Sequence, residues 1–182
     1  MYFIFLLTIL FLILASFILV ATVFFLIQLL ILRAPYVKTP PHVIKKILSE
    51  IKINPGGTMY DLGCGDASVL IAMEKKFGAK TIGFELSPIA YYRAKQKIKH
   101  ERAQTEVYFK SFFKQNISDA DVVFCFLVPG IMKRVGTYLD SQLKKSAQVI
   151  SYAFPIPQWQ PSKILNTLPN GDKASKIYIY NK

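Results

Sequence analysis

Two acidic residues and two glycines lie within six consecutive positions at the end of an apolar run. In the stretch "MYDLGCGDASVL" (59–70), Asp61, Gly63, Gly65 and Asp66 stand between a strand-like run and a helix-like pattern. Glycines at such a junction allow a ligand to approach the backbone closely. Glu85 follows Gly65 by 20 residues, the spacing at which nucleotide-binding folds place an acid beside the ribose hydroxyls. The spacing therefore predicts a site for a ligand that contains a nucleoside.

The charges around these glycines distinguish between nucleoside ligands. The third glycine of a dinucleotide-binding G-x-G-x-x-G would fall at Ser68, and the carboxylates of Asp61 and Asp66 would repel a pyrophosphate. Two carboxylates instead suit a ligand with an ammonium group and no phosphate. S-adenosylmethionine is such a ligand, with an amino-acid end, a ribose and a sulfonium that avoids positive surroundings. A purely structural alternative stays open here, in which Asp66 only caps a helix and Asp61 only ends a strand.

Apolar runs alternate with amphipathic stretches through the rest of the chain. The expected strands are 58–62, 81–85, 106–110, 121–127 and 148–153. The expected helices are 43–51, 67–77, 88–102 and 130–143, with Asp66 and Ser87 as N-caps of the second and third. Strands and helices that alternate in this way indicate an α/β fold with a mostly parallel, doubly wound sheet. Segments 163–168 and 175–180, joined by "PNGD", are expected to form a C-terminal antiparallel hairpin.

The first 32 residues contain no charged residue, no glycine and no proline. About 20 apolar residues cross a bilayer as a helix, so this segment predicts one transmembrane anchor. The alternative is a cleaved secretory signal, which has a basic start and a shorter apolar core, whereas the first basic residue here is Arg33. We therefore expect an anchor at 1–32, a linker at 33–41 that spans at most about 30 Å, and one domain at 42–182.

The domain carries all the charge of the chain, with a net charge of +12 from 23 Lys and Arg against 11 Asp and Glu. Basic residues just after the expected span predict, by the positive-inside rule, a single-pass protein with a cytoplasmic domain and its N-terminus outside. A second basic group lies in "RAKQKIKHERA". Its members are Arg93, Lys95, Lys97, Lys99 and Arg102. This group predicts a solvated helix face, a contact with anionic lipid, or a contact with RNA phosphates, and the expected anchor favours lipid over nucleic acid.

Cys64 and Cys125 show no spacing typical of a metal site, and we expect no metal and two small, buried, reduced side chains.

Two segments resemble a known superfamily. "YDLGCGDA" and "IGFELSP" are similar to motifs I and II of class I S-adenosylmethionine-dependent methyltransferases. "PYVKTPPHVIKKIL", "FKSFF", "VVFCFLVP" and "AFPIPQWQP" resemble one branch of it. That branch contains the small archaeal broad-specificity protein-lysine methyltransferase and the membrane-anchored mitochondrial lysine methyltransferases of the ATP synthase c-subunit and the ADP/ATP carrier. The resemblance covers about 35–180 and implies a Rossmann-like methyltransferase fold.

The resemblance implies roles for individual residues. The methionine end of S-adenosylmethionine would be lined by Asp61, Gly63, Cys64, Gly65 and Asp66. Glu85 would bind the ribose, and Ser111 would lie near the adenine, where the family commonly has Asn or Asp. Ala67 stands in place of the usual third glycine of the motif and Ser68 in place of a usual Arg; we expect Ala67 to be helical and its methyl group to be tolerated.

Methyl transfer to an amine is an in-line displacement, to which an enzyme contributes mainly alignment and desolvation. A lysine must first lose a proton, and an apolar, aromatic channel lowers its pKa from about 10.4 by desolvation. The candidates for such a channel are Tyr36, Phe126, Phe154 and Trp159, each of which also suits a plain core position. No general base is apparent in the sequence. "FLVP" stands where amide and adenine methyltransferases have (D/N)PPY, which disfavours those substrates.

Three classes of function stay open at this stage. The first is a membrane-anchored protein-lysine methyltransferase that acts on membrane-proximal lysines of a protein substrate. The second is a methyltransferase for a lipid, a quinone or another small molecule, because an anchor equally suits a substrate dissolved in the bilayer. The third is a non-enzymatic, cofactor-binding membrane protein, suggested by the departures at Ala67 and Ser111.

Overall fold

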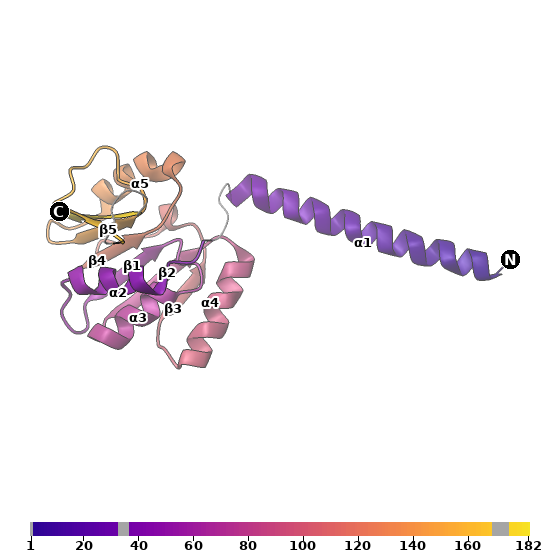
Figure 1. The fold of residues 1–182 in the computed structure, drawn as a ribbon, viewed down its shortest axis with the longest axis horizontal. Helices are drawn as coiled ribbons and strands as arrows, with labels where there is room; N and C mark the ends of the chain where they lie inside the picture. Colours follow the sequence, from indigo (N-terminus) through magenta and orange to yellow (C-terminus); the bar gives the residue numbers. More distant parts are fainter. Residues whose placement is uncertain (1, 33–36, 169–174) are drawn as a thin grey trace. The chain divides into compact units, whose positions relative to one another are not determined.

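The structure, a computed structural model, describes residues 2–32, 37–168 and 175–182, and for 27–32 it describes the backbone alone. The chain divides into two compact units, Met1–Pro35 and Tyr36–Lys182 (Figure 1). Each unit is described by itself.

The first unit contains the helix α1 (Tyr2–Leu32). Among the described residues, Tyr2–Leu26 is the one helical stretch long and apolar enough to cross a membrane, and its most apolar part is not buried by the chain at all. A signal sequence meets the same criteria of length and composition. The hydroxyls of Thr8, Ser16 and Thr22 donate hydrogen bonds to carbonyls three or four residues earlier, so they are satisfied within the helix.

The second unit is built on one seven-stranded sheet with the strand order β3-β2-β1-β4-β5-β7-β6. The strands are β1 (Thr58–Leu62), β2 (Lys80–Glu85), β3 (Glu106–Phe109), β4 (Val122–Cys125), β5 (Gln148–Tyr152), β6 (Lys163–Asn166) and β7 (Lys176–Asn181). Strands β1 to β5 run parallel to one another, and β7 is antiparallel to both β5 and β6. The mostly parallel sheet and the C-terminal antiparallel pair confirm the expected fold; the expected turn "PNGD" lies outside the described residues.

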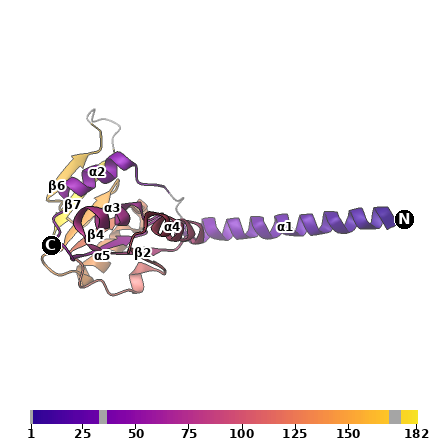
Figure 2. The same cartoon turned by 90° about the horizontal axis from the view of Figure 1, so that it is seen from below.

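Helices cover both faces of this sheet. They are α2 (Pro41–Glu50), α3 (Ser68–Phe77), α4 (Pro88–Glu101), α5 (Pro129–Gln142) and the short 3-10 helix η1 (Phe112–Lys114). Apolar residues of α2, α3 and α4 form one buried cluster with the sheet, whereas η1 and α5 form a second cluster on its other face. Figure 2 shows α2 beside β6, where Lys163 pairs with Glu50 at 2.7 Å. Successive side chains of each strand point to opposite faces of the sheet, so the same strands contribute apolar residues to both clusters.

Helix α4 begins and ends as the sequence predicts. The Ser87 hydroxyl accepts a hydrogen bond from the backbone N–H of Ala90 at 3.4 Å, and Pro88 occupies the first helical position. The helix ends where Arg102 adopts a left-handed backbone conformation with φ of 51°.

Helix α3 corrects one expectation. It begins at Ser68, and Ala67 precedes it with φ of 60°, so Ala67 is not helical. Its methyl group is fully buried in a left-handed backbone conformation, which costs a residue other than glycine about 1–2 kcal/mol. The substitution that we expected to be tolerated therefore carries a backbone cost.

Strand β4 is shorter than predicted because it ends at Cys125. Phe126 and Leu127 are half-buried and pack against the two core clusters from the following loop. The sequence therefore predicted too long a strand, because these two apolar residues are partly buried without being paired in the sheet.

Gly83 of β2 packs closely against the loop after β1. A Cβ atom on Gly83 would lie 2.6 Å from Cys64 Sγ and 2.7 Å from Leu70 Cδ1. Both neighbours are buried, so neither can move without disturbing the core.

We therefore expect Gly83→Ala to reduce the free energy of unfolding by about 1–3 kcal/mol, the usual cost of overpacking a core. Gly130→Ala is the matched control, because a Cβ there meets nothing within 4 Å and alanine favours a helix. Unfolding of the detergent-solubilised chain in urea is followed by the fluorescence of its one tryptophan, Trp159, which packs on Tyr180. Equal unfolding midpoints for the two variants would contradict the close packing at Gly83.

Candidate functional site

The loop between β1 and α3 is fixed to the end of β2 by backbone hydrogen bonds. The N–H groups of Gly63 and Cys64 both donate to the carbonyl oxygen of Phe84, at 2.9 and 3.0 Å. Gly63 and Gly65 have φ of 90° and 56°, left-handed conformations that glycine adopts without a steric cost. The loop therefore lies at the carboxyl ends of two central parallel strands, where open α/β sheets bind their ligands.

A third loop reaches the same place. A Cβ on Gly63 would lie 2.9 Å from Cδ2 of Leu127, which follows β4. Glycine at this position thus allows the loop after β4 to pack directly on the loop after β1.

Asp61, at the end of β1, is a buried carboxylate with an unsatisfied oxygen. Its side chain is 2% exposed, and Oδ1 has no hydrogen-bond partner among the described residues. Burial, together with the negative charges of Glu85 and Asp66, raises the pKa of Asp61 well above its ordinary value. An unpaired buried carboxylate is destabilising unless a ligand supplies a donor. Asp61 therefore fits a ligand with an ammonium group, as the sequence predicted.

Glu85 holds the neighbouring backbone in place. Its Oε2 accepts a hydrogen bond from the N–H of Gly65 at 2.9 Å, and its Oε1 accepts from Leu86 and Ser87 at 2.8 and 2.7 Å. A carboxylate has about four acceptor positions, so about one remains for a ligand hydroxyl.

Asp66 is held by groups that the sequence did not assign to it. Oδ1 accepts hydrogen bonds from the backbone and hydroxyl of Ser68, while Oδ2 pairs with Lys97 at 3.2 Å and Lys38 at 3.8 Å. Burial acts to raise the pKa of Asp66, but the hydrogen bonds from Ser68 and the charge of Lys97 outweigh it and lower that pKa. Asp66 precedes the N-cap position, Ala67, yet it still accepts the N–H of the first helical residue, Ser68.

Lys97 is the residue whose place sequence reasoning missed. We expected it on a basic surface of α4, but its ammonium donates to Ser68 Oγ as well as pairing with Asp66. The available signal was the pair Asp66 and Ser68: a partly buried carboxylate beside a neutral residue favours a cation from another element.

The two cysteines lie in the core. Burial raises the pKa of the Cys64 thiol, with the charges of Asp61 and Glu85 adding to the effect, and raises that of Cys125 to about 12. Both thiols are therefore protonated at neutral pH. Over 2–32, 37–168 and 175–182, no three His, Cys, Asp or Glu side chains are grouped so as to hold a metal ion.

Ser111, the residue expected near the adenine, lies between β3 and η1 and is half-buried. Its side chain makes no capping hydrogen bond, while its carbonyl oxygen accepts one from Gln115 Nε2 at 3.2 Å.

The aromatic residues expected around a substrate channel are not gathered in one place. Phe126 contacts Tyr152, with ring centroids 4.5 Å apart, beside the carboxyl ends of β4 and β5. Phe154 and Trp159 pack on the α5 side of the sheet instead, and the Trp159 indole donates to Asp140 Oδ2 at 3.1 Å. Tyr36 lies outside the described residues. Tyr152 is the aromatic residue beside Phe126 that the sequence analysis did not select.

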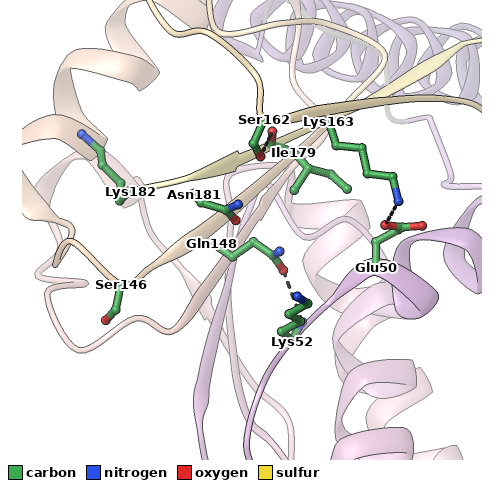
Figure 3. A pocket seen from close by; sticks show the side chains of 9 residues that line it. All are labelled: Glu50, Lys52, Ser146, Gln148, Ser162, Lys163, Ile179, Asn181 and Lys182. Carbon is green, nitrogen blue, oxygen red and sulfur yellow. Dashed lines mark hydrogen bonds and ion pairs between the residues drawn. The ribbon is translucent and has the colours of Figure 1, made fainter.

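A separate cleft of about 540 Å³ lies at the opposite, amino ends of the strands (Figure 3). Gln148 is the first residue of β5 and Asn181 the last of β7, and both line this cleft. Two of its charged side chains, Lys163 and Glu50, are paired with one another at 2.7 Å. The cleft is therefore at the opposite edge of the sheet from the unpaired carboxylate of Asp61.

The sequence of this chain matches that of known methyltransferases. A profile of the ANTKMT methyltransferase domain matches residues 61–163. A protein-lysine N-methyltransferase from Saccharolobus islandicus is 30% identical over 151 residues, which cover 81% of this chain and 93% of that protein. The human lysine N-methyltransferase of the ATP synthase c-subunit is also 30% identical over 151 residues, covering 81% of this chain and 61% of that protein. The mouse adenine nucleotide translocase lysine N-methyltransferase is 27% identical, and the match covers 82% of this chain and 64% of that protein. This chain thus spans somewhat less than two thirds of the two mammalian relatives.

Solved structures agree with this match. An RNA methyltransferase from Salinibacter ruber, in complex with S-adenosyl-L-homocysteine, aligns with a TM-score of 0.73 and 26% identity over 80% of this chain and 93% of that chain. A tRNA methyltransferase from B. subtilis aligns with a TM-score of 0.61 at 12% identity over 80% of this chain and 67% of that chain, which shows the fold alone. The expected cofactor, S-adenosylmethionine, is thereby confirmed, and the unsatisfied Asp61 carboxylate fits its ammonium group.

The unpaired carboxylate generates a prediction about stability. Because the pKa of Asp61 is raised in the folded state, the fold loses stability as the pH rises from about 4, the unfolded value, towards the raised value. Asp61→Asn removes this loss, so the ligand-free variant should be more stable than the parent at neutral pH by roughly 1–3 kcal/mol, and the gain should vanish at low pH. Denaturant unfolding at a series of pH values measures it.

The same variant should bind the cofactor more weakly. Loss of a hydrogen bond to an ionised group costs about 1.5–3 kcal/mol, so calorimetry with S-adenosylhomocysteine should show at least about a tenfold lower affinity. A variant that is less stable than the parent at neutral pH, or that binds unchanged, would contradict the assignment of Asp61.

Proposed function

Because this chain belongs to the ANTKMT methyltransferase family of S-adenosylmethionine-dependent protein-lysine methyltransferases, we propose that it is a membrane-anchored member that methylates lysines close to the membrane surface. The proposed substrate is a protein, and in particular an integral membrane protein. The observation that carries the proposal is the buried, unpaired Asp61 at the glycine loop of a chain whose first helix is uncharged and unburied.

We assign the cofactor contacts to the residues that surround this loop. Asp61 accepts hydrogen bonds from the ammonium group, and the left-handed Gly63 and Gly65 leave room for the amino-acid end. Glu85 receives a ribose hydroxyl at its remaining acceptor position while its other bonds hold the loop. Cys64 packs beneath the loop, Asp66 anchors it to α4 through Lys97, and Ser111 lies towards the adenine.

The bound cofactor supplies a methyl group activated by a positive sulfonium. The chain itself supplies alignment and a dry surface, to which we assign the half-buried ring of Phe126, backed by the buried ring of Tyr152. A lysine ammonium that loses water against these rings is a stronger acid than in solution, so its proton leaves at a lower pH. The ring faces still attract the cationic form as it arrives.

We assign the anchor to α1 and the methyltransferase domain to the cytoplasmic side, with the N-terminus outside. Over Tyr2–Leu26, the hydroxyls of Thr8, Ser16 and Thr22 bond to helix carbonyls, which suits a lipid environment where water cannot satisfy them. Lysines follow α1 in the chain, and by the positive-inside rule they keep the C-terminal part of the chain in the cytoplasm.

We further propose that α4 contacts anionic lipid. Its exposed basic residues, Arg93, Lys95 and Lys99, are followed by Arg102 at its C-cap. Lys97 is left out of this contact because its ammonium pairs with Asp66. Juxtamembrane basic residues are attracted to anionic headgroups, which favours lipid rather than nucleic acid as the partner.

Methyl-labelled S-adenosylmethionine tests the substrate class directly. Added to membranes that contain the full chain, it should label protein, and hydrolysis of that protein should release methylated lysine. Label in extracted lipid would favour the lipid or quinone alternative, and label in RNA would point to a nucleic-acid substrate. Glu85→Ala is the matched control: at limiting cofactor it should lower the labelling at least about tenfold, since hydrogen bonds to an ionised group contribute about 1.5–3 kcal/mol.

Deletion of residues 1–32 tests the purpose of the anchor. A tether raises the effective concentration of a substrate in the same membrane without changing any contact. The shortened chain should therefore methylate a free, lysine-rich protein at nearly the parent rate and a membrane-embedded protein more slowly. An equal loss on both substrates would mean that α1 is needed by the fold, and no loss on either would mean that it plays no part in substrate choice.

A further inference from the structure

The exposed large apolar side chains of the second unit are concentrated on one side of it. Of those among its described residues, only Ile164 and Leu168 belong to the β6 region. The others are Val37, Leu86, Ile89, Tyr92, Tyr108 and Phe109, which come from the segment before α2, the start of α4, and β3. Leu86 adjoins the proposed ribose site and Tyr108 stacks on the core residue Phe84. We call the remaining four, Val37, Ile89, Tyr92 and Phe109, the apolar rim.

Contacts within the structure connect the elements that carry the apolar rim. Ile89 and Tyr92 are three residues apart on α4 and share one face of the helix. The ring of Tyr91 lies 5.6 Å from that of Phe109, which joins this helix to β3. Lys38, which follows Val37, pairs with the same oxygen of Asp66 as Lys97 of α4, so the segment that contains Val37 is connected to this helix.

Exposure of this extent calls for a partner. Ile89, Tyr92 and Phe109 are 56%, 64% and 52% exposed, and clustered apolar groups of this kind mark contacts with proteins or membranes. Exposed basic residues, Lys95 and Lys99, follow on the same helix, and the chain carries a net charge of +12. A surface with an aromatic and aliphatic rim beside lysines suits the interfacial layer of a bilayer that contains anionic lipid.

The connection to α1 selects the membrane as the occupant. Only residues 33–36 separate the last helical residue of α1 from Val37, which itself belongs to the apolar rim. Along the sequence, the chain that follows the proposed anchor therefore enters the second unit at a member of the rim.

We propose that the apolar rim inserts into the interfacial layer of the membrane that holds α1, so that the cofactor loop opens along the membrane surface. This inference rests on the proposed membrane anchoring, and it adds a specific orientation of the domain. It also specifies the substrate class: lysines that lie within a side-chain length of the headgroups.

Lipid quenching of a fluorescent probe tests the orientation. Ile89→Cys and Ile164→Cys place a thiol at positions of similar exposure, 56% and 50%, on α4 and on the β6 edge. Because the native Cys64 and Cys125 are buried, a polarity-sensitive thiol dye labels only the introduced cysteine. The full chain is placed in vesicles of phosphatidylcholine and phosphatidylserine that contain brominated lipid. The dye at position 89 should lose severalfold more fluorescence than the dye at position 164.

Equal quenching at the two positions, or stronger quenching at 164, would overturn the inference. Flotation of the vesicles separates this result from a failure of the proposed anchoring. A chain that floats with the vesicles but shows no preferential quenching at 89 refutes the orientation and leaves the anchor standing. A chain that does not float refutes both.

A second measurement covers the case in which labelling disturbs the fold. Ile89→Glu should slow methylation of a membrane-embedded substrate severalfold and leave the rate of methylation of a soluble, lysine-rich substrate unchanged. The reason is that a carboxylate enters the interfacial layer of an anionic membrane only at a cost in free energy. Ile164→Glu should change neither rate. Equal rates on the embedded substrate for the two variants would contradict the inference.

Discussion

The carboxylate of Glu85 is the constraint on which the rest of the site depends. By accepting the N–H groups of Gly65, Leu86 and Ser87, it joins the loop after β1 to the turn that begins α4. Two further hydrogen bonds to the Phe84 carbonyl and the close packing of Cys64 on Gly83 complete the attachment. The loop is therefore shaped by β2 before any ligand arrives, and less conformational entropy is lost on binding. The same geometry leaves Asp61 buried and unpaired, a local cost that the fold retains where a ligand amine would be held.

The sheet and its order of helices were predictable because each signal was local. Ser87-Pro88 predicted the start of α4, and the apolar runs predicted five strands to within one or two residues. The pairing of Asp66 was not predictable in this way, since Lys97 lies 31 residues further along and reaches Asp66 only once α3 and α4 are packed together. The conformation of Ala67 was also missed, because its φ depends on the path of the loop and not on its own side chain.

Ala67 and Ser68, the two adjacent residues that were expected to depart from the superfamily motif, have different consequences for the loop. At Ala67 the methyl group imposes a left-handed backbone cost of about 1–2 kcal/mol, although the methyl group itself is buried in the core. At Ser68 the change is compensated in space: the serine hydroxyl donates to Asp66, and Lys97 places its charge against both. A cation carried by α4 rather than by α3 ties the loop to a second helix, so the packing of α4 and the charge balance of the loop depend on each other.

The charge of the chain poses a problem for a lysine methyltransferase that the proposed anchoring resolves. Both the chain, at +12, and a lysine substrate are cationic, so long-range electrostatics slow their encounter. Salt screens this repulsion beyond about 10 Å, and in the proposed lipid contact of α4 the anionic headgroups would neutralise it further. Confinement of enzyme and substrate to one membrane would raise their effective concentration, so they would meet often even without electrostatic attraction. In this view the basic residues bind the membrane and do not select the substrate. Which lysine is methylated depends instead on the apolar surface around Phe126 and on the height of the site above the bilayer.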